Sequence, residues 1–126
     1  MRLLGIDYGA KRVGVAISDE DRRLAFPKSV ILNSRELSNT LRDMALEAGT
    51  THIIMGESRN FKGEKNAVMD GILKLKNEHE GFNLTVSLEP EFMTSQQAAR
   101  LQGEGSELDA SSAALILQSY LDKQHN

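Results

Sequence analysis

The first third of the chain alternates apolar with polar or small residues, with the period of two that is typical of β-strands. Residues 3–8 predict one strand, and residues 12–18 predict a second in which every other position is Val or Ile. A tight turn at residues 9–11 joins the two, and residues 24–32 can supply a third strand after a polar turn. The opening segment is therefore expected to fold as an antiparallel meander.

Beyond residue 32 the spacing of apolar residues changes to that of helices alternating with short strands. Asn33 followed by Glu36 predicts a capping box, and the helix after it is expected to end at Gly49. The later elements are expected in this order: a strand at residues 51–55, a helix ending before Gly81, a strand at 84–88, a short helix at 94–101 and a last helix at 108–123.

This order, βββαβαβαα, predicts one mixed five-stranded sheet in the α/β class. Three antiparallel strands are followed by parallel strands, and helices flank the sheet on its faces. The first and fifth strands then lie on either side of the fourth, and the last helix returns across the sheet. Several folds share the pattern, which is also the element order of the RNase H-like fold.

Composition is that of one globular domain spanning residues 1–126. Apolar residues make up 40% and charged residues 26%, and no apolar run is long enough to cross a membrane. The acid at residue 7 comes before any apolar region that a signal peptide needs, so export is not expected. The chain has no cysteine, which fits a cytoplasmic location.

The formal net charge of −3 argues mildly against a nucleic-acid partner, because proteins that hold a phosphate backbone are usually basic on at least one face. The distribution of charge is more favourable. Basic residues form two groups, Lys11, Arg12, Arg22 and Arg23 in the first and Arg59, Lys62 and Lys65 in the second. Lys11, Arg12, Arg59 and Lys62 are the candidate contacts to nucleic acid, and the alternative is that both groups are ordinary solvated turns.

Carboxylates occur where the predicted topology would bring them together. Asp7 lies in the first strand near the centre of the sheet, where an acid needs a partner or a cation. Glu89 and Glu91 follow the fifth strand, and Asp109 begins the last helix. Each has a structural alternative: a turn into Gly9 for Asp7, an acidic loop for the glutamates and helix capping for Asp109.

The convergence of these acids would suit two divalent cations. Mg²⁺ and Mn²⁺ prefer oxygen ligands and can share carboxylates, and such a pair activates water and orients a phosphodiester. A site of this kind needs no amino-acid nucleophile, which agrees with a chain that lacks cysteine.

Three segments resemble the YqgF family, small bacterial nucleases of RNase H-like fold identified as Holliday-junction resolvases and pre-ribosomal-RNA nucleases. Residues 5–19 are similar to the family's opening motif, Gly-x-Asp-x-Gly-x-Lys-Arg-x-Gly-x-Ala-x-Ser-Asp. Residues 93–95 with Ala98 resemble the segment after its Asp-Glu-Arg motif, and residues 109–121 resemble its closing helix. The resemblance runs from the first strand to the last helix and is loose in the middle.

The resemblance implies a metal-dependent nuclease in which Asp7, Glu91 and Asp109 are the catalytic residues and the ligands of Mg²⁺ or Mn²⁺. It implies maturation of precursor 16S ribosomal RNA, with Holliday-junction resolution on branched DNA as the alternative. Two positions depart from the family: Pro90-Glu91-Phe92 stands for Asp-Glu-Arg, and Gly56-Glu57-Ser58 for Gly-Leu-Pro. Glu89 could take the place of the missing aspartate.

Two other functions remain open from the sequence. A nucleic-acid-binding module of the same fold without turnover would explain the altered Asp-Glu-Arg segment and the acidic net charge. The strand–turn–strand around Asp7 also resembles the first phosphate-binding loop of sugar kinases and actin-like ATPases. Those enzymes use two such domains, whereas this chain has room for one and carries no Walker motif.

Overall fold

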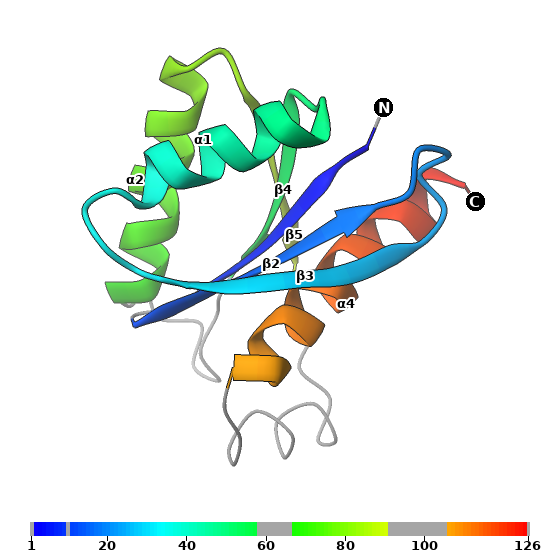
Figure 1. Cartoon of the computed structure of the whole chain (residues 1–126), viewed down its shortest axis with the longest axis horizontal. Helices are drawn as coiled ribbons and strands as arrows, with labels where there is room; N and C mark the ends of the chain where they lie inside the picture. Colours follow the sequence, from blue (N-terminus) through cyan, green and yellow to red (C-terminus); the bar gives the residue numbers. More distant parts are fainter. Residues whose placement is uncertain (1, 10, 58–66, 91–105, 126) are drawn as a thin grey trace.

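The structure is a mixed sheet of five strands in the order β3-β2-β1-β4-β5 (Figure 1). It is a computed structural model that describes residues 2–9, 11–57, 67–90 and 106–125. Its elements are β1 Leu4–Tyr8, β2 Arg12–Ser18, β3 Ala25–Leu32, α1 Leu37–Ala48, β4 His52–Glu57, α2 Ala67–Gly81, β5 Thr85–Pro90 and α4 Ser106–Gln124. Over the described residues, the predicted element order and the mixed sheet are confirmed. The predicted short helix at residues 94–101 lies outside the described residues.

The antiparallel half of the sheet is the predicted meander. β1 pairs with β2, β2 pairs with β3, and the second ladder shifts register at a bulge between Val15 and Ala16. Pro27 lies on β3 beside this bulge. Since β3 is an edge strand, the missing N–H of proline can face outward, where no ladder partner needs it.

The parallel half places β1 at the centre of the sheet. Ile6 pairs with Met55 on β4, and Met55 in turn pairs with Leu88 on β5. One residue further along, Gly56 pairs with Glu89. As predicted, the first and fifth strands lie on either side of the fourth.

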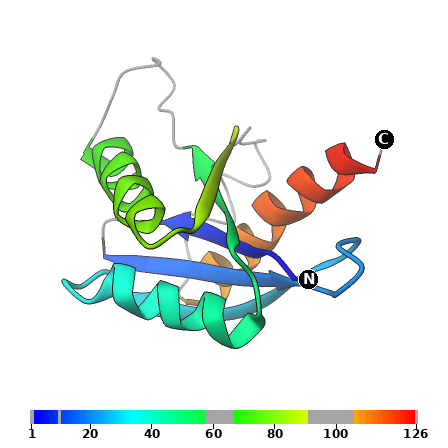
Figure 2. The same ribbon diagram turned by 90° about the horizontal axis from the view of Figure 1, so that it is seen from above.

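Helices cover the two faces of the sheet unequally. α1 and α2 lie on one face, and α4 covers the other (Figure 2). The alternation along β1 sorts its residues between these layers: Leu4 and Ile6 pack in the cluster under α1 and α2, whereas Leu3 packs with the residues of α4. Of the helices that the structure describes, none combines the length and apolar character that a bilayer crossing requires.

α1 ends as the sequence predicts but begins differently. Gly49 closes the helix with a left-handed φ of 71° and donates to the carbonyl of Ala45. The predicted capping box is wrong, because Glu36 occupies the N-cap without a side-chain capping bond. The Asn33 side chain instead donates to the carbonyl of Gly9, 2.8 Å away. The Asn33 side chain therefore makes a tertiary hydrogen bond instead of capping α1.

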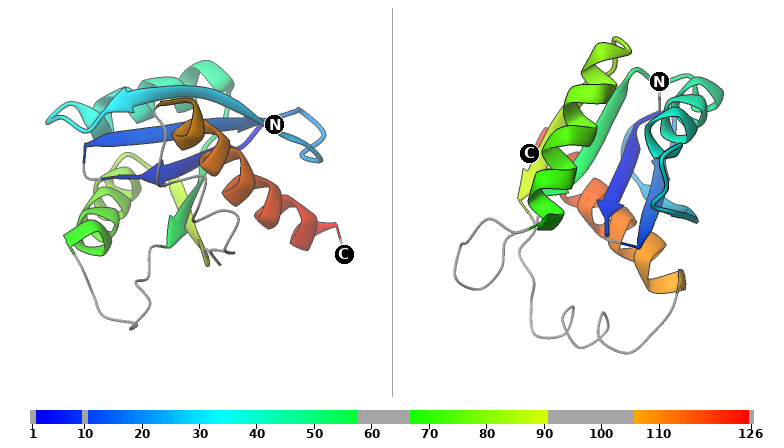
Figure 3. Two further views of the ribbon diagram at one scale, coloured as in Figure 1. Left: turned by 90° about the horizontal axis from the view of Figure 1, so that it is seen from below. Right: turned by 90° about the vertical axis from the view of Figure 1, so that its left-hand side faces the viewer.

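α4 packs closely against the sheet at Gly5. A Cβ at this position would lie 2.7 Å from the Leu117 Cβ and 3.1 Å from the Ala113 carbonyl. Only a residue without a side chain therefore lets the helix backbone pack this near to β1. Figure 3 shows α4 lying obliquely across this face of the sheet.

His79, near the end of α2, is fully buried. Its Nε2 lies 3.3 Å from the carbonyl of Ser38 on α1, and its Nδ1 has no hydrogen-bond partner among the described residues. Burial lowers the pKa of His79, and the Ser38 hydrogen bond opposes only part of that effect. The folded protein consequently holds this imidazole neutral.

We expect acidification to destabilise the fold through His79. Because its pKa is lower in the folded state, its contribution to stability is complete above about pH 6.5, the ordinary histidine pKa, and is lost as pH falls below that value. Urea unfolding at pH 7.5 and 5.5 should show a larger loss for the wild type than for His79→Gln. Equal losses in the two proteins would contradict this assignment.

Candidate functional site

Asp7 lies near the end of the central strand β1 and is half-buried. Side chains alternate along a strand, so Asp7 projects to the same face as Gly5, which is the face covered by α4. Its antiparallel neighbour on β2 is Gly14, which leaves room beside the carboxylate. The predicted position of this acid, near the centre of the sheet, is confirmed.

The first turn of α4 comes to the same end of β1. Gln118, further along α4, bonds to the backbone of Ala25 at the start of β3, and Ala25 pairs with Ser18 beside the start of β1. The helix therefore runs back along β1, and its beginning lies toward the strand end that carries Asp7. Asp109 belongs to this first turn, but its side chain lies outside the described part, so its convergence with Asp7 stays a prediction.

Glu89 was predicted to follow the fifth strand, and this prediction is wrong. The residue lies within β5. β5 extends to Pro90, and only 5% of the Glu89 side chain is exposed. Its Oε1 accepts a hydrogen bond from the Ser119 hydroxyl at 2.9 Å and an ion-pair contact from Lys123 Nζ at 2.5 Å, both from α4. β5 can extend to Pro90 because it is an edge strand. No further strand lies beyond it to need the backbone N–H that proline lacks.

Lys11 and Arg12 are both exposed where β1 turns into β2, next to Asp7. Two contacts from Asn33 fix this turn: its side chain donates to Gly9, and its backbone N–H donates to the Lys11 carbonyl at 2.9 Å. Gly9 itself has no space for a side chain, because a Cβ would lie 2.4 Å from the Arg12 carbonyl. The predicted contacts Arg59 and Lys62 and the predicted ligand Glu91 lie outside the described residues.

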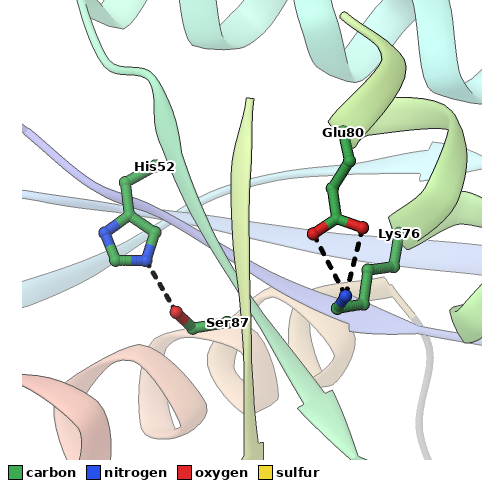
Figure 4. Close-up of polar contacts among 4 residues, drawn as sticks. All are labelled: His52, Lys76, Glu80 and Ser87. Atoms are coloured by element: carbon green, nitrogen blue, oxygen red, sulfur yellow. Dashed lines mark hydrogen bonds and ion pairs between the residues drawn. The ribbon is translucent and has the colours of Figure 1, made fainter. Parts of the chain in front are cut away.

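A second polar group lies on the α4 face, where β4 and β5 begin. His52 Nε2 is 2.8 Å from the Ser87 hydroxyl (Figure 4), and the His52 ring meets Tyr120 of α4 edge to face. Burial, with a smaller effect from Arg22, lowers the pKa of His52. The imidazole is therefore mostly neutral near pH 7. Sequence spacing gave no signal for this group, because its members come from three separate elements.

The carboxylates offer hard oxygen ligands, which suit Mg²⁺ or Mn²⁺ rather than a thiol-binding metal. In the ranges where side chains are described, no three acids or histidines gather into a metal site. Asp7 is the one predicted ligand whose side chain falls in those ranges. The other two predicted ligands, Glu91 and Asp109, lie outside those ranges, so the metal site stays a prediction.

Curated relatives match almost the whole chain. A protein from Endomicrobium trichonymphae named "Putative pre-16S rRNA nuclease" is 31% identical, and the match covers 98% of this chain and 96% of the relative. A protein of the same name from Chlorobaculum tepidum is 32% identical over 96% of this chain and 93% of its own length.

Solved structures of resolvases share the architecture. A complex of Fowlpox virus resolvase with Holliday-junction DNA has a TM-score of 0.65 at 12% identity and covers all of both chains. RuvC of T. thermophilus with a Holliday-junction substrate has a TM-score of 0.61 at 13% identity, covering 100% of this chain and 97% of RuvC. At identities this low, the structural likeness establishes the fold alone, which is RNase H-like. The family described as RuvX: Holliday junction resolvase matches residues 1–123, and the chain belongs to that family.

Proposed function

We propose that this protein is a metal-dependent nuclease that hydrolyses phosphodiester bonds during maturation of precursor 16S ribosomal RNA. The observation that carries the proposal is the placement of Asp7: a carboxylate at the end of the central strand, on the face that the first turn of α4 approaches. Membership of the RuvX family and the names of the curated relatives support the reaction and the substrate. The proposed activity is cytoplasmic.

Asp7, Glu91 and Asp109 would hold the divalent cations, two ions of Mg²⁺ or Mn²⁺. When bound, such ions lower the pKa of water and stabilise the charge that develops on the phosphate. The role of the protein is to hold its carboxylates in position around them. Asp7 is held in position by its strand, because β1 is hydrogen-bonded on both sides, to β2 and to β4.

Lys11 and Arg12 are placed to contact the substrate backbone. Both are exposed at the turn directly after Asp7, and the bonds from Asn33 hold that turn against β3. Cations there would neutralise phosphates next to the scissile bond, a contribution that is independent of sequence and weakened by salt. Arg59 and Lys62 are proposed for the same role.

Holliday-junction resolution is the second candidate, favoured by the family description and by the structural neighbours in complex with junction DNA. Cutting a two-fold symmetric junction generally calls for a two-fold dimer. RNA maturation makes no such demand on the chain. A module that binds nucleic acid without cutting it is the third candidate.

A cleavage assay with two substrates separates the three candidates. Wild-type protein is incubated with precursor 16S ribosomal RNA and with a four-way DNA junction, in Mg²⁺, in Mn²⁺ and in EDTA. We expect metal-dependent cleavage of the RNA. Cleavage of the junction alone would favour the resolvase. Binding of either substrate without cleavage in any metal would favour the binding module.

A further inference from the structure

Glu89 is a buried acid whose charge is already balanced within the chain. Lys123 Nζ contacts its Oε1 at 2.5 Å, and the Ser119 hydroxyl donates to the same oxygen. The Lys123 side chain is 55% exposed, so the ammonium reaches in from solvent over a carboxylate that water hardly touches. Removing the cation alone would leave a buried charge uncompensated, which is strongly unfavourable.

Glu89 also lies level with Asp7 across the sheet. Ile6 pairs with Met55, and Gly56 pairs with Glu89, so extending the first register by one residue puts Asp7, Gly56 and Glu89 in one row. Two strand spacings separate the two acids by about 10 Å between Cα atoms. Both project toward α4, and the residue between them has no side chain.

We propose that Lys123 is a positioning residue that keeps Glu89 out of the cation site beside Asp7. This inference rests on the proposed metal-dependent function. A carboxylate in this row would otherwise be a natural additional ligand for a hard cation. The Lys123 ammonium already balances the Glu89 carboxylate, so Glu89 is withheld as a ligand from the cation beside Asp7.

The same pair orients α4. Ser119 and Lys123 are one helical turn apart and meet a single carboxylate oxygen, which ties the second half of α4 to β5. The close packing at Gly5 ties the middle of α4 to β1. These two attachments fix the direction in which α4 delivers its first turn toward Asp7.

Mn²⁺ binding, followed by the electron paramagnetic resonance of the free ion, tests the inference without any cleavage. Glu89→Gln should bind Mn²⁺ as the wild type does, within about twofold, because Glu89 is not a ligand. Lys123→Met should bind Mn²⁺ on the order of tenfold more tightly, since it exposes a carboxylate to the cation and removes a positive charge. The double variant Glu89→Gln with Lys123→Met should return to the wild-type affinity.

Two further variants serve as controls. Lys123→Arg keeps the cation and should behave as the wild type. Lys76→Met breaks the exposed pair with Glu80 on α2 (Figure 4), 3.1 Å long, and should leave Mn²⁺ binding unchanged. It matches Lys123→Met in chemistry but lies on the opposite side of the sheet.

Two results would overturn the inference. Weaker Mn²⁺ binding by Glu89→Gln would make Glu89 a ligand in the wild type, and this result stands even if Lys123→Met does not fold. Unchanged binding by a folded Lys123→Met would show that Glu89 is out of reach of the cation. Failure of the proposed function would give a different result. Asp7→Asn would then bind Mn²⁺ with the same affinity as the wild type, irrespective of the result for Lys123→Met.

Discussion

Replacing Asp7 with asparagine is expected to reduce metal-dependent cleavage by roughly three orders of magnitude or more while leaving RNA binding nearly intact. The substitution preserves the shape of the side chain and removes the negative charge that a cation needs. The loss should fall on the transition state, because the proposed contacts to RNA in the ground state are basic residues such as Lys11 and Arg12 rather than Asp7. Single-turnover rates and filter-binding affinities, measured on the same preparations, separate the two effects.

The glutamates near the end of β5 supply the comparison for Asp7→Asn. Glu91→Gln should resemble it, whereas Glu89→Gln should be mild, because Glu89 is held by Ser119 and Lys123. A large loss of cleavage rate in Glu89→Gln, with none in Glu91→Gln, would mean that Glu89 rather than Glu91 is the ligand. If wild type and Asp7→Asn are equally inert on RNA and on junction DNA, the protein binds nucleic acid without cutting it.

Gly5→Ala is expected to destabilise the fold by about 1–3 kcal/mol, because the new methyl group would overlap the backbone layer of α4. The Leu117 Cβ at 2.7 Å and the Ala113 carbonyl at 3.1 Å belong to the helix itself and cannot rotate away. The helix has to move outward instead. For a domain of this size, the melting temperature should fall by roughly 4–12 °C.

Gly81→Ala is the matched control for Gly5→Ala. Gly81 ends α2, its φ is not in the left-handed region, and nothing lies within 4 Å of an added Cβ. Its melting temperature should change little or rise slightly. The cleavage rate of Gly5→Ala, measured well below its melting temperature, should also fall, because the helix that moves carries Asp109. A melting temperature equal to that of Gly81→Ala would show that α4 does not press on β1.

The sheet could be predicted from the sequence because its information is local. Val13, Val15 and Ile17 alternate with small residues along β2, and in the structure the valines pack under α1 and α2 while Ala16 packs under α4. The order of elements then left few topologies, which is why the central place of Asp7 was predictable. The stop of α1 at Gly49 was equally local, since it needs only one left-handed residue.

The contacts that shape the candidate site were not predictable, because each joins distant parts of the chain. Asn33 had the sequence signature of a cap, yet its amide donates to the carbonyl of Gly9, in the turn between β1 and β2. Glu89 had the signature of a loop acid, and its burial depends on a lysine in the last helix. No pattern in the sequence near either residue distinguishes these roles from the commoner ones.

The attachment of α4 has a consequence for how the molecule folds. The helix that packs against the first strand is made after every strand of the sheet, so the Gly5–Leu117 contact closes a long loop and forms late. While the chain is still emerging from the ribosome, the meander can form, but Asp7 has no α4 beside it. On the proposed function, the nascent chain would therefore have an incomplete cation site, and cleavage would begin only after α4 has been synthesised.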